Sequence, residues 1–280
     1  MEKAFEVWSW SAAVLARSLL PIVVLAAFLG LWALAAYEWL WIPESSIFVL
    51  MLSFVWAIAQ LLAAAAVLAG TVTSAVRVAD ANAQALYLPF SMWFGRTHQT
   101  SSSAFLIGFS RKHFAASFLW LIAASVIGLA LAEVFAWVNQ RSIEVASFLT
   151  FHSGKPVSYL MIDKCITAIE WLIWIAVTVA LLDLLMVFWR SGWQPARRQF
   201  GRVLTASCFG RPFLSGFLSV LVFGGLAYLL ALWRPTVPAG FWDYTQLVLR
   251  VVVVLTLVAA GWLFWLLCLA RLSSRTEAAS

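Results

Sequence analysis

Long apolar segments alternate with shorter polar connections along the whole chain. Six of these segments are long enough to cross a bilayer as a helix, which takes about 20 residues. They cover about residues 12–34, 46–70, 114–138, 160–189, 213–233 and 246–270. The pattern predicts an all-α integral membrane protein with six transmembrane helices, forming a single domain over residues 1–280.

The composition supports a membrane protein. Apolar residues make up 64% of the 280 residues, and charged residues make up 11%. A soluble domain cannot bury that much apolar surface, so we expect lipid to surround most of the chain. The net charge of +6 is then read as an orientation signal and not as a nucleic-acid-binding surface.

Basic residues favour one side of the membrane. Arginines are frequent between spans two and three and between spans four and five, whereas the first connection contains Glu38, Glu44 and no basic residue. The positive-inside rule therefore predicts that both termini are cytoplasmic, in a bacterial inner membrane. Tryptophans cluster near the predicted span ends, where their amphipathic rings prefer the headgroup boundary.

A short apolar segment that ends in an arginine precedes each odd-numbered span. The three arginines are Arg17, Arg111 and Arg211. We expect each segment to be a short helix at the cytoplasmic headgroup boundary, followed by one of three antiparallel helical hairpins. Helices that start at this side of a membrane share such features without internal repetition, so the sequence leaves both explanations open.

The starts of spans three and five also carry a family resemblance. Arg111 and Arg211 are each followed by a long span rich in Leu, Val and Phe. Over its later two-thirds the chain resembles bacterial six-helix membrane proteins of unknown function, which are similar to the membrane domain of some glycerophosphodiester phosphodiesterases. In those enzymes a separate soluble domain performs the hydrolysis, and we expect no such domain in this chain. The resemblance implies an anchor or lipid-facing module.

Ionisable residues at membrane depth are the strongest candidates for a functional site, because an unpaired charge is costly there. The spans place Arg17 and Asp183 in their inner parts, and Glu133, Glu170 and Arg250 in their outer parts. Depth permits ion pairs of Arg17 with Asp183, and of Arg250 with Glu170 or Glu133. Such pairs fasten helices together, line an ion or substrate pathway, or contact a partner subunit, and the sequence does not separate these roles.

Motifs for catalysis or cofactor binding are absent. The histidines His98, His113 and His152 all lie outside the predicted spans. The chain has no His-Glu-x-x-His zinc helix, no phosphate-binding loop and no dinucleotide fingerprint. We therefore expect no catalytic residues, no metal site, no cofactor and no enzymatic activity.

The sequence favours a non-catalytic multi-pass membrane subunit or lipid-associated scaffold within a larger membrane complex. The expected partners are membrane lipids, other membrane subunits or further copies of the chain, and no nucleic acid. The inner face is expected to bind anionic lipid headgroups. The residues predicted for this role are Arg111, Lys112, Arg197, Arg198 and Arg211.

The alternative function is a small transporter or channel. It would use Asp183, Glu170 and Arg250 along a polar path through the spans. Helices broken near the midplane are typical of transporters. The chain has Pro21 near the inner end of span one but no paired break in corresponding halves, which counts against transport.

Overall fold

The computed structural model describes residues 2–41, 46–81, 111–233 and 241–277, and within them it contains helices and no strand. The predicted all-α class is therefore confirmed. Six helical segments are long and apolar enough to cross a membrane. They are α2 (Leu19–Leu40), α3 (Ile47–Asp80), α5 (Arg111–Gln140), α7 (Tyr159–Ser191), the run α9–η2–α10 (Arg211–Leu232) and α11 (Phe241–Glu277).

The first span begins later than the sequence predicts. Residues from 12 onward do not continue into one helix, because α1 (Glu2–Ala16) ends and the chain turns at Arg17 and Ser18 before α2. The Ser18 hydroxyl donates a hydrogen bond to the Val14 carbonyl at 2.6 Å, which satisfies one of the last carbonyls of α1. Pro21 lies in the first turn of α2, where the missing N–H has no helical partner to lose.

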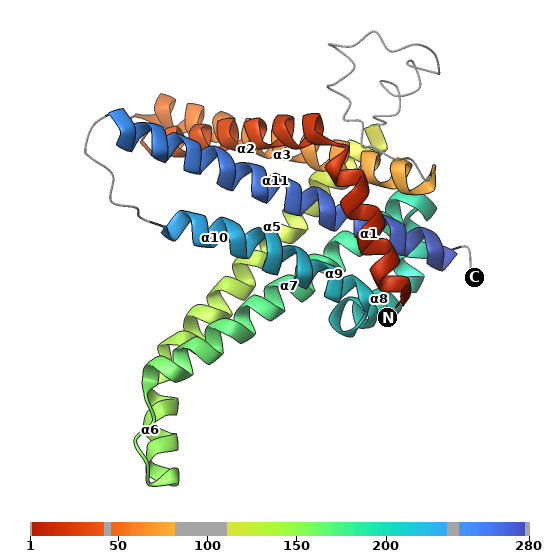
Figure 1. Cartoon of the computed structure of the whole chain (residues 1–280). Coiled ribbons are helices and arrows are strands. Elements are labelled where there is room, and N and C mark those ends of the chain that lie inside the picture. The colour runs from red at the N-terminus through yellow and green to blue at the C-terminus, as the bar shows by residue number, and fades with distance from the viewer. Residues whose placement is uncertain (1, 42–45, 82–110, 234–240, 278–280) are drawn as a thin grey trace.

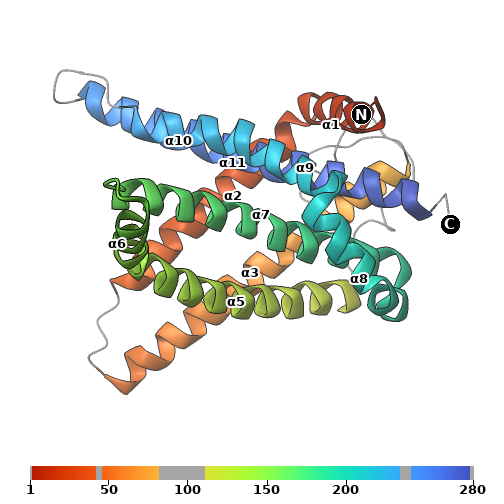
Figure 2. The ribbon, with the colours of Figure 1, turned by 90° about the horizontal axis from the view of Figure 1, so that it is seen from below.

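Three shorter helices lie crosswise to the long ones. Both chain termini lie at one end of the bundle, which we call the terminal end (Figure 1). There α1 crosses α11, and α8 (Trp193–Phe209) crosses the end of α7 (Figures 1 and 2). At the opposite, distal end, α6 (Ser142–Ser153) projects from the tip of the α5–α7 hairpin (Figure 1). The predicted short helices before spans one and five are therefore present, and the one before span three lies outside the described residues.

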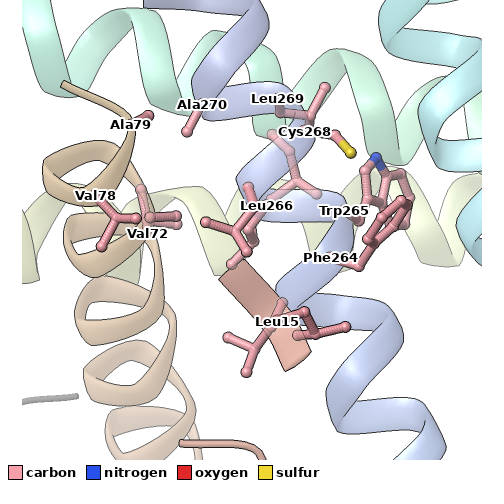
Figure 3. Close-up of a cluster of buried hydrophobic side chains, with 14 of the residues drawn as sticks. Leu15, Val72, Val78, Ala79, Phe264, Trp265, Leu266, Cys268, Leu269 and Ala270 are labelled. Carbon is pink, nitrogen blue, oxygen red and sulfur yellow. The ribbon is translucent and has the colours of Figure 1, made fainter. Parts of the chain in front are cut away.

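Helix α11 is the centre of the bundle. It contacts α1, α2, α3, α7 and the α9–α10 run. Nearly all side chains of residues 259–270 are buried there. Figure 3 shows Leu266 and Ala270 of α11 facing Val72 and Ala79 of α3, with Leu15 of α1 close by. Consecutive long helices do contact each other, but α2 and α3 each pack more extensively on α11 than on one another.

The long helices separate toward the distal end. One arm contains α2, α3, α10 and the first half of α11, and the other contains α5, α6 and α7 (Figure 1). Large apolar side chains are exposed along both arms, among them Leu31, Phe54 and Leu129. Tryptophan side chains connect the first two long helices, because Trp32 donates to the Gln60 carbonyl and Trp56 to the Ala35 carbonyl.

The fifth long segment is irregular near its middle. Helix α9 (Arg211–Ser219) passes through the π-helical turn η2 (Val220–Gly224) into α10 (Gly225–Leu232). The turn lies against α11, where a Cβ added at Gly261 would be 2.8 Å from the Cβ of Phe223. The Ser219 hydroxyl donates to the Gly261 carbonyl at 2.8 Å. Single π-helical turns of this kind are inserted into α-helices without ending them.

Candidate functional site

A buried arginine joins three helices at the terminal end. The side chain of Arg190, near the end of α7, is 7% exposed. Its guanidinium donates to Asp80 Oδ1 at 2.7 Å, to Ser273 Oγ at 3.0 Å and to the Ala270 carbonyl at 2.9 Å. These contacts connect α7 with α3 and α11. A planar guanidinium with several N–H groups suits such a junction, because it can satisfy several acceptors at once.

A second arginine extends the same cluster to α1. Arg271 on α11 donates to the Ala79 carbonyl at 3.1 Å, near the end of α3. Its guanidinium carbon lies 4.9 Å from the centre of the Trp10 ring, which is a cation–π contact. Arg190 and Arg271 together fasten α1, α3, α7 and α11 at the terminal end.

Asp183 lies deeper in the bundle and lacks such contacts. Its residue exposure is 9%, and it makes no hydrogen bond or ion pair within the described part of the chain. The charge that acts on it electrostatically is the guanidinium of Arg190. Arg190 lies two helical turns further along α7, about 10 Å along the axis and on the same face. Because Arg190 already binds Asp80, Asp183 is a buried carboxyl without a direct counter-ion.

The predicted pair of Arg17 and Asp183 is wrong. Arg17 lies in the exposed turn between α1 and α2, outside both helices. Asp183 is influenced by Arg190 instead, because both residues lie on one face of α7. The prediction assumed that the first span continues through Arg17, and the helix break removes that position from the interior.

The second predicted pairing is also wrong. Among the described residues the ion pairs are Arg190–Asp80 and Arg141–Glu144, and Arg250 joins neither Glu170 nor Glu133. Arg250 lies on the distal half of α11, whereas Glu133 and Glu170 lie on α5 and α7 in the other arm. The arms separate at this level, which prevents contact between the charges (Figure 1). Glu133 is exposed, and Glu170 and Arg250 are half-buried.

Helix α8 carries two of the predicted headgroup-binding arginines, Arg197 and Arg198. Ala196, Val203 and Ser207 are buried on the face that packs against α7. Next to that face lies a stripe of exposed apolar side chains. It consists of Trp193, Phe200 and Leu204. The opposite, polar face of the helix is basic.

The arginines of this region are available for binding. Arg197, Arg198 and Arg202 on α8 are exposed, as is Arg211 at the first residue of α9. None of them forms an ion pair with a carboxylate in the described residues. Arg111 begins α5 as predicted for the start of span three. The side chains of Arg111 and Lys112 lie outside the described ones.

The described residues contain no group of three or more His, Cys, Asp or Glu side chains that could hold a metal ion. The distal end has an open cavity of about 520 Å3 between α6 and the start of α7. Ile143, Ala146, Phe151 and Tyr159 are among its lining residues, and none of the lining side chains is charged. The lining of this cavity is mostly apolar, and its polar groups are the hydroxyls of Ser147, Thr150, Ser158 and Tyr159.

Sequence reasoning missed several members of the terminal cluster. Asp80, Arg271 and Trp10 are separated from Arg190 by long stretches of chain, so no local pattern connects them. The proximity of Arg190 to Asp183 could have been inferred from the sequence, because a spacing of seven residues places both on one helical face.

Comparisons with protein-family models, with curated proteins and with solved structures find no match for this chain. The resemblance to the membrane domain of glycerophosphodiester phosphodiesterases therefore stays a prediction.

Proposed function

We propose that the chain is a non-catalytic multi-pass membrane protein that binds anionic lipid headgroups at its terminal end and acts as a scaffold for other membrane subunits. Six candidate spans and the exposed apolar surface of both arms support insertion in a bilayer. The terminal end, with its exposed arginines, is the cytoplasmic side by the positive-inside rule. Both termini lie at this end (Figure 1).

The geometry of α8 is the observation that carries this proposal. An interfacial helix needs an apolar stripe for the acyl region and a basic face for the headgroups. On α8 the stripe of Trp193, Phe200 and Leu204 lies between the buried face and the basic face with Arg198 and Arg202. The helix also lies crosswise to α7, as a helix in the membrane plane would if α7 spans (Figure 2).

A charge-reversal variant tests the proposal. Arg197→Glu, Arg198→Glu and Arg211→Glu are combined in the full chain, in nanodiscs of anionic phosphatidylglycerol and zwitterionic phosphatidylcholine. Each basic residue near an anionic surface contributes roughly 1 kcal/mol. Native mass spectrometry of the released protein is therefore expected to show a large loss of retained anionic lipid, with zwitterionic lipid unchanged.

The matched control reverses three exposed basic residues at the distal end, Arg141, Lys155 and Lys164. This variant makes the same change in net charge and is expected to keep the anionic lipid. Equal losses in both variants, or no loss in the α8 variant, would show that α8 is not the binding surface.

Transport remains the second candidate, and the π-helical turn η2 gives it an observation that the sequence lacked. Irregular helices that line a site are typical of transporters. The lipid-associated scaffold is preferred because Glu170 and Arg250 lie on separate arms and form no path with Asp183.

A further inference from the structure

Several buried polar groups meet at the junction of α7, α8, α9 and α11. The hydroxyl of Ser207, the indole nitrogen of Trp265 and the Nε of Arg190 have no hydrogen-bond partner in the described part of the chain. Asp183, also buried, makes no hydrogen bond or ion pair there either. Buried polar groups are nearly always paired in native proteins, so four without protein partners in one region call for a specific explanation.

The packing at Gly216 places Trp265 beside the face of α7 that carries Asp183. Val179, one helical turn before Asp183, and Trp265 of α11 both press on Gly216 of α9. A Cβ added at Gly216 would be 2.8 Å from Val179 Cγ2 and 2.9 Å from Trp265 Cε2, the carbon bonded to the indole nitrogen. Trp265 lies on the side of α11 away from Val72 and Val78 of α3 (Figure 3).

Helix α8 brings Ser207 to the same junction. Val203 of α8 packs with Val187, which lies one turn after Asp183 on α7. Ser207 is one turn further along the buried face of α8 and is fully buried. Both α8 and the following helix α9 pack against α7, so Ser207, near the end of α8, lies beside that helix.

We propose that this junction is a proton-binding site, in which the Asp183 carboxyl takes up one proton from water and releases it again. An unpaired charged carboxylate is costly in a low-dielectric interior, whereas the protonated carboxyl is neutral. Uptake forms one O–H bond and needs no other reactant. When the proton leaves, the carboxylate has the charge of Arg190 about 10 Å away along α7, and Ser207 and Trp265 are the donors at the junction that have no partner among the described residues.

The surrounding chemistry favours a proton over a metal ion. Metal cations such as Ca²⁺ and Mg²⁺ require several oxygen ligands. The other carboxylate nearby, Asp80, is bound to Arg190. The indole N–H of Trp265 and the Nε–H of Arg190 are hydrogen-bond donors, which cannot coordinate a cation. Asp183 belongs to no group of metal-ligating side chains in the described chain.

The charged and titratable groups on the elements packed against α7 lie mostly toward the terminal end. From α3, α8, α9 and α11 these are Arg77, Asp80, Arg197, Arg198, Arg202, Cys208, Arg211, Asp243, Tyr244, Arg250, Cys268 and Arg271. Helix α5 contributes Glu133, and α6 contributes Glu144 and His152, all in the distal half. Arg190 is the group that acts on Asp183.

Chemical labelling tests the site directly. Dicyclohexylcarbodiimide enters membranes and adds to protonated carboxyl groups. With the full chain in nanodiscs, peptide mass spectrometry is expected to find Asp183 modified several-fold more at acidic than at alkaline pH. Added Na⁺, K⁺ or Li⁺ at constant pH should leave the modification unchanged. Protection by one of these ions would overturn the proton assignment in favour of a metal cation.

A second measurement tests the proposal even if the carbodiimide cannot reach Asp183. Infrared difference spectra between acidic and alkaline samples are expected to show the C=O band of a protonated carboxyl, which Asp183→Asn abolishes and Asp183→Glu restores. The control variants Glu133→Gln and Glu170→Gln should keep the band. If neither the label nor the band depends on Asp183 in folded protein, the proposal is wrong.

The outcome is independent of lipid binding by α8. The Arg197, Arg198 and Arg211 charge-reversal variant should retain the Asp183 label. Asp183→Asn should in turn retain anionic lipid. A failure of either proposal therefore leaves the other testable.

Discussion

The terminal and distal halves of the bundle differ in how their apolar residues are used. In the terminal half, α11 buries nearly all of residues 259–270 among the surrounding helices. In the distal half the same helix exposes Leu247, Val248 and Leu249 by 54%, 61% and 62%. Lipid tails are as apolar as these side chains, so apolarity alone does not draw the arms together.

The two halves therefore differ in their polar contacts between helices and in how closely the helix backbones approach one another. The terminal half has the Arg190–Asp80 pair, in which the Arg190 side chain is 7% exposed and the Asp80 side chain 52%, and small residues such as Gly216 allow its helices to touch. The distal half has the exposed Arg141–Glu144 pair, whose side chains are 50% and 64% exposed. Matched substitutions in the two halves can measure this difference.

The largest expected difference comes from the two ion pairs. Asp80→Asn removes a half-exposed carboxylate that accepts a hydrogen bond from the buried Arg190 guanidinium, and losing a hydrogen bond to a charged group costs about 1.5–3 kcal/mol. Glu144→Gln leaves an exposed Arg141, and loss of an exposed pair costs about 0.2–1 kcal/mol. Thermal unfolding in detergent, followed by tryptophan fluorescence, compares them. Equal shifts in Tm would show that the terminal ion pair stabilises the fold no more than the exposed distal pair does.

A smaller effect is expected from two glycines of the same long segment. Gly216→Ala forces a methyl group against Val179 and Trp265, and overpacking of this kind costs about 1–3 kcal/mol. Gly225→Ala meets no atom within 4 Å, so it is expected to leave the unfolding temperature unchanged or raised. A lower Tm for Gly225→Ala than for Gly216→Ala would contradict close packing in the terminal half.

The smallest difference is expected for tryptophans that donate to a neighbouring helix. Trp120 donates to the Leu181 carbonyl at 2.7 Å, between α5 and α7, in a half-buried position. Trp32 donates to the Gln60 carbonyl at 3.4 Å in an exposed position on the distal arm. Trp120→Phe is expected to cost about 1 kcal/mol, and Trp32→Phe less. The same unfolding assay measures which substitution lowers Tm more. A larger loss for Trp32→Phe would show that the stronger hydrogen bond between helices lies in the distal arm.

Much of the helix count was predictable, because each long helix carries its own apolar run. The division between α1 and α2 was missed since the apolar pattern continues across Arg17 and Ser18. Pro21 was the available signal, because proline is tolerated in the first turn of a helix and not in its interior.

The candidate site was less predictable than the helices. Asp183 was identified correctly as a charge inside a span, and α8 contains the predicted Arg197 and Arg198. The partners were not predictable, because depth along a span says nothing about which helices are neighbours. Arg250 and Glu170 share a depth but lie on separate arms, whereas Arg190 reaches Asp80, which is 110 positions away in the sequence.

The π-helical turn in the fifth long segment contains one residue more than a regular α-helix would need to join α9 to α10. An α-helix rotates by about 100° and rises 1.5 Å per residue. A π-helical turn uses one more residue to complete a turn than an α-helical turn does. Deleting one residue from Val220–Gly224 would therefore restore a regular helix and leave α10 in nearly its present rotation, so that Ala227 stays buried. A deletion in the regular part of α9 would instead turn everything after it by about 100°. The π-helical turn is thus the place where this segment can change its length by one residue without rotating α10.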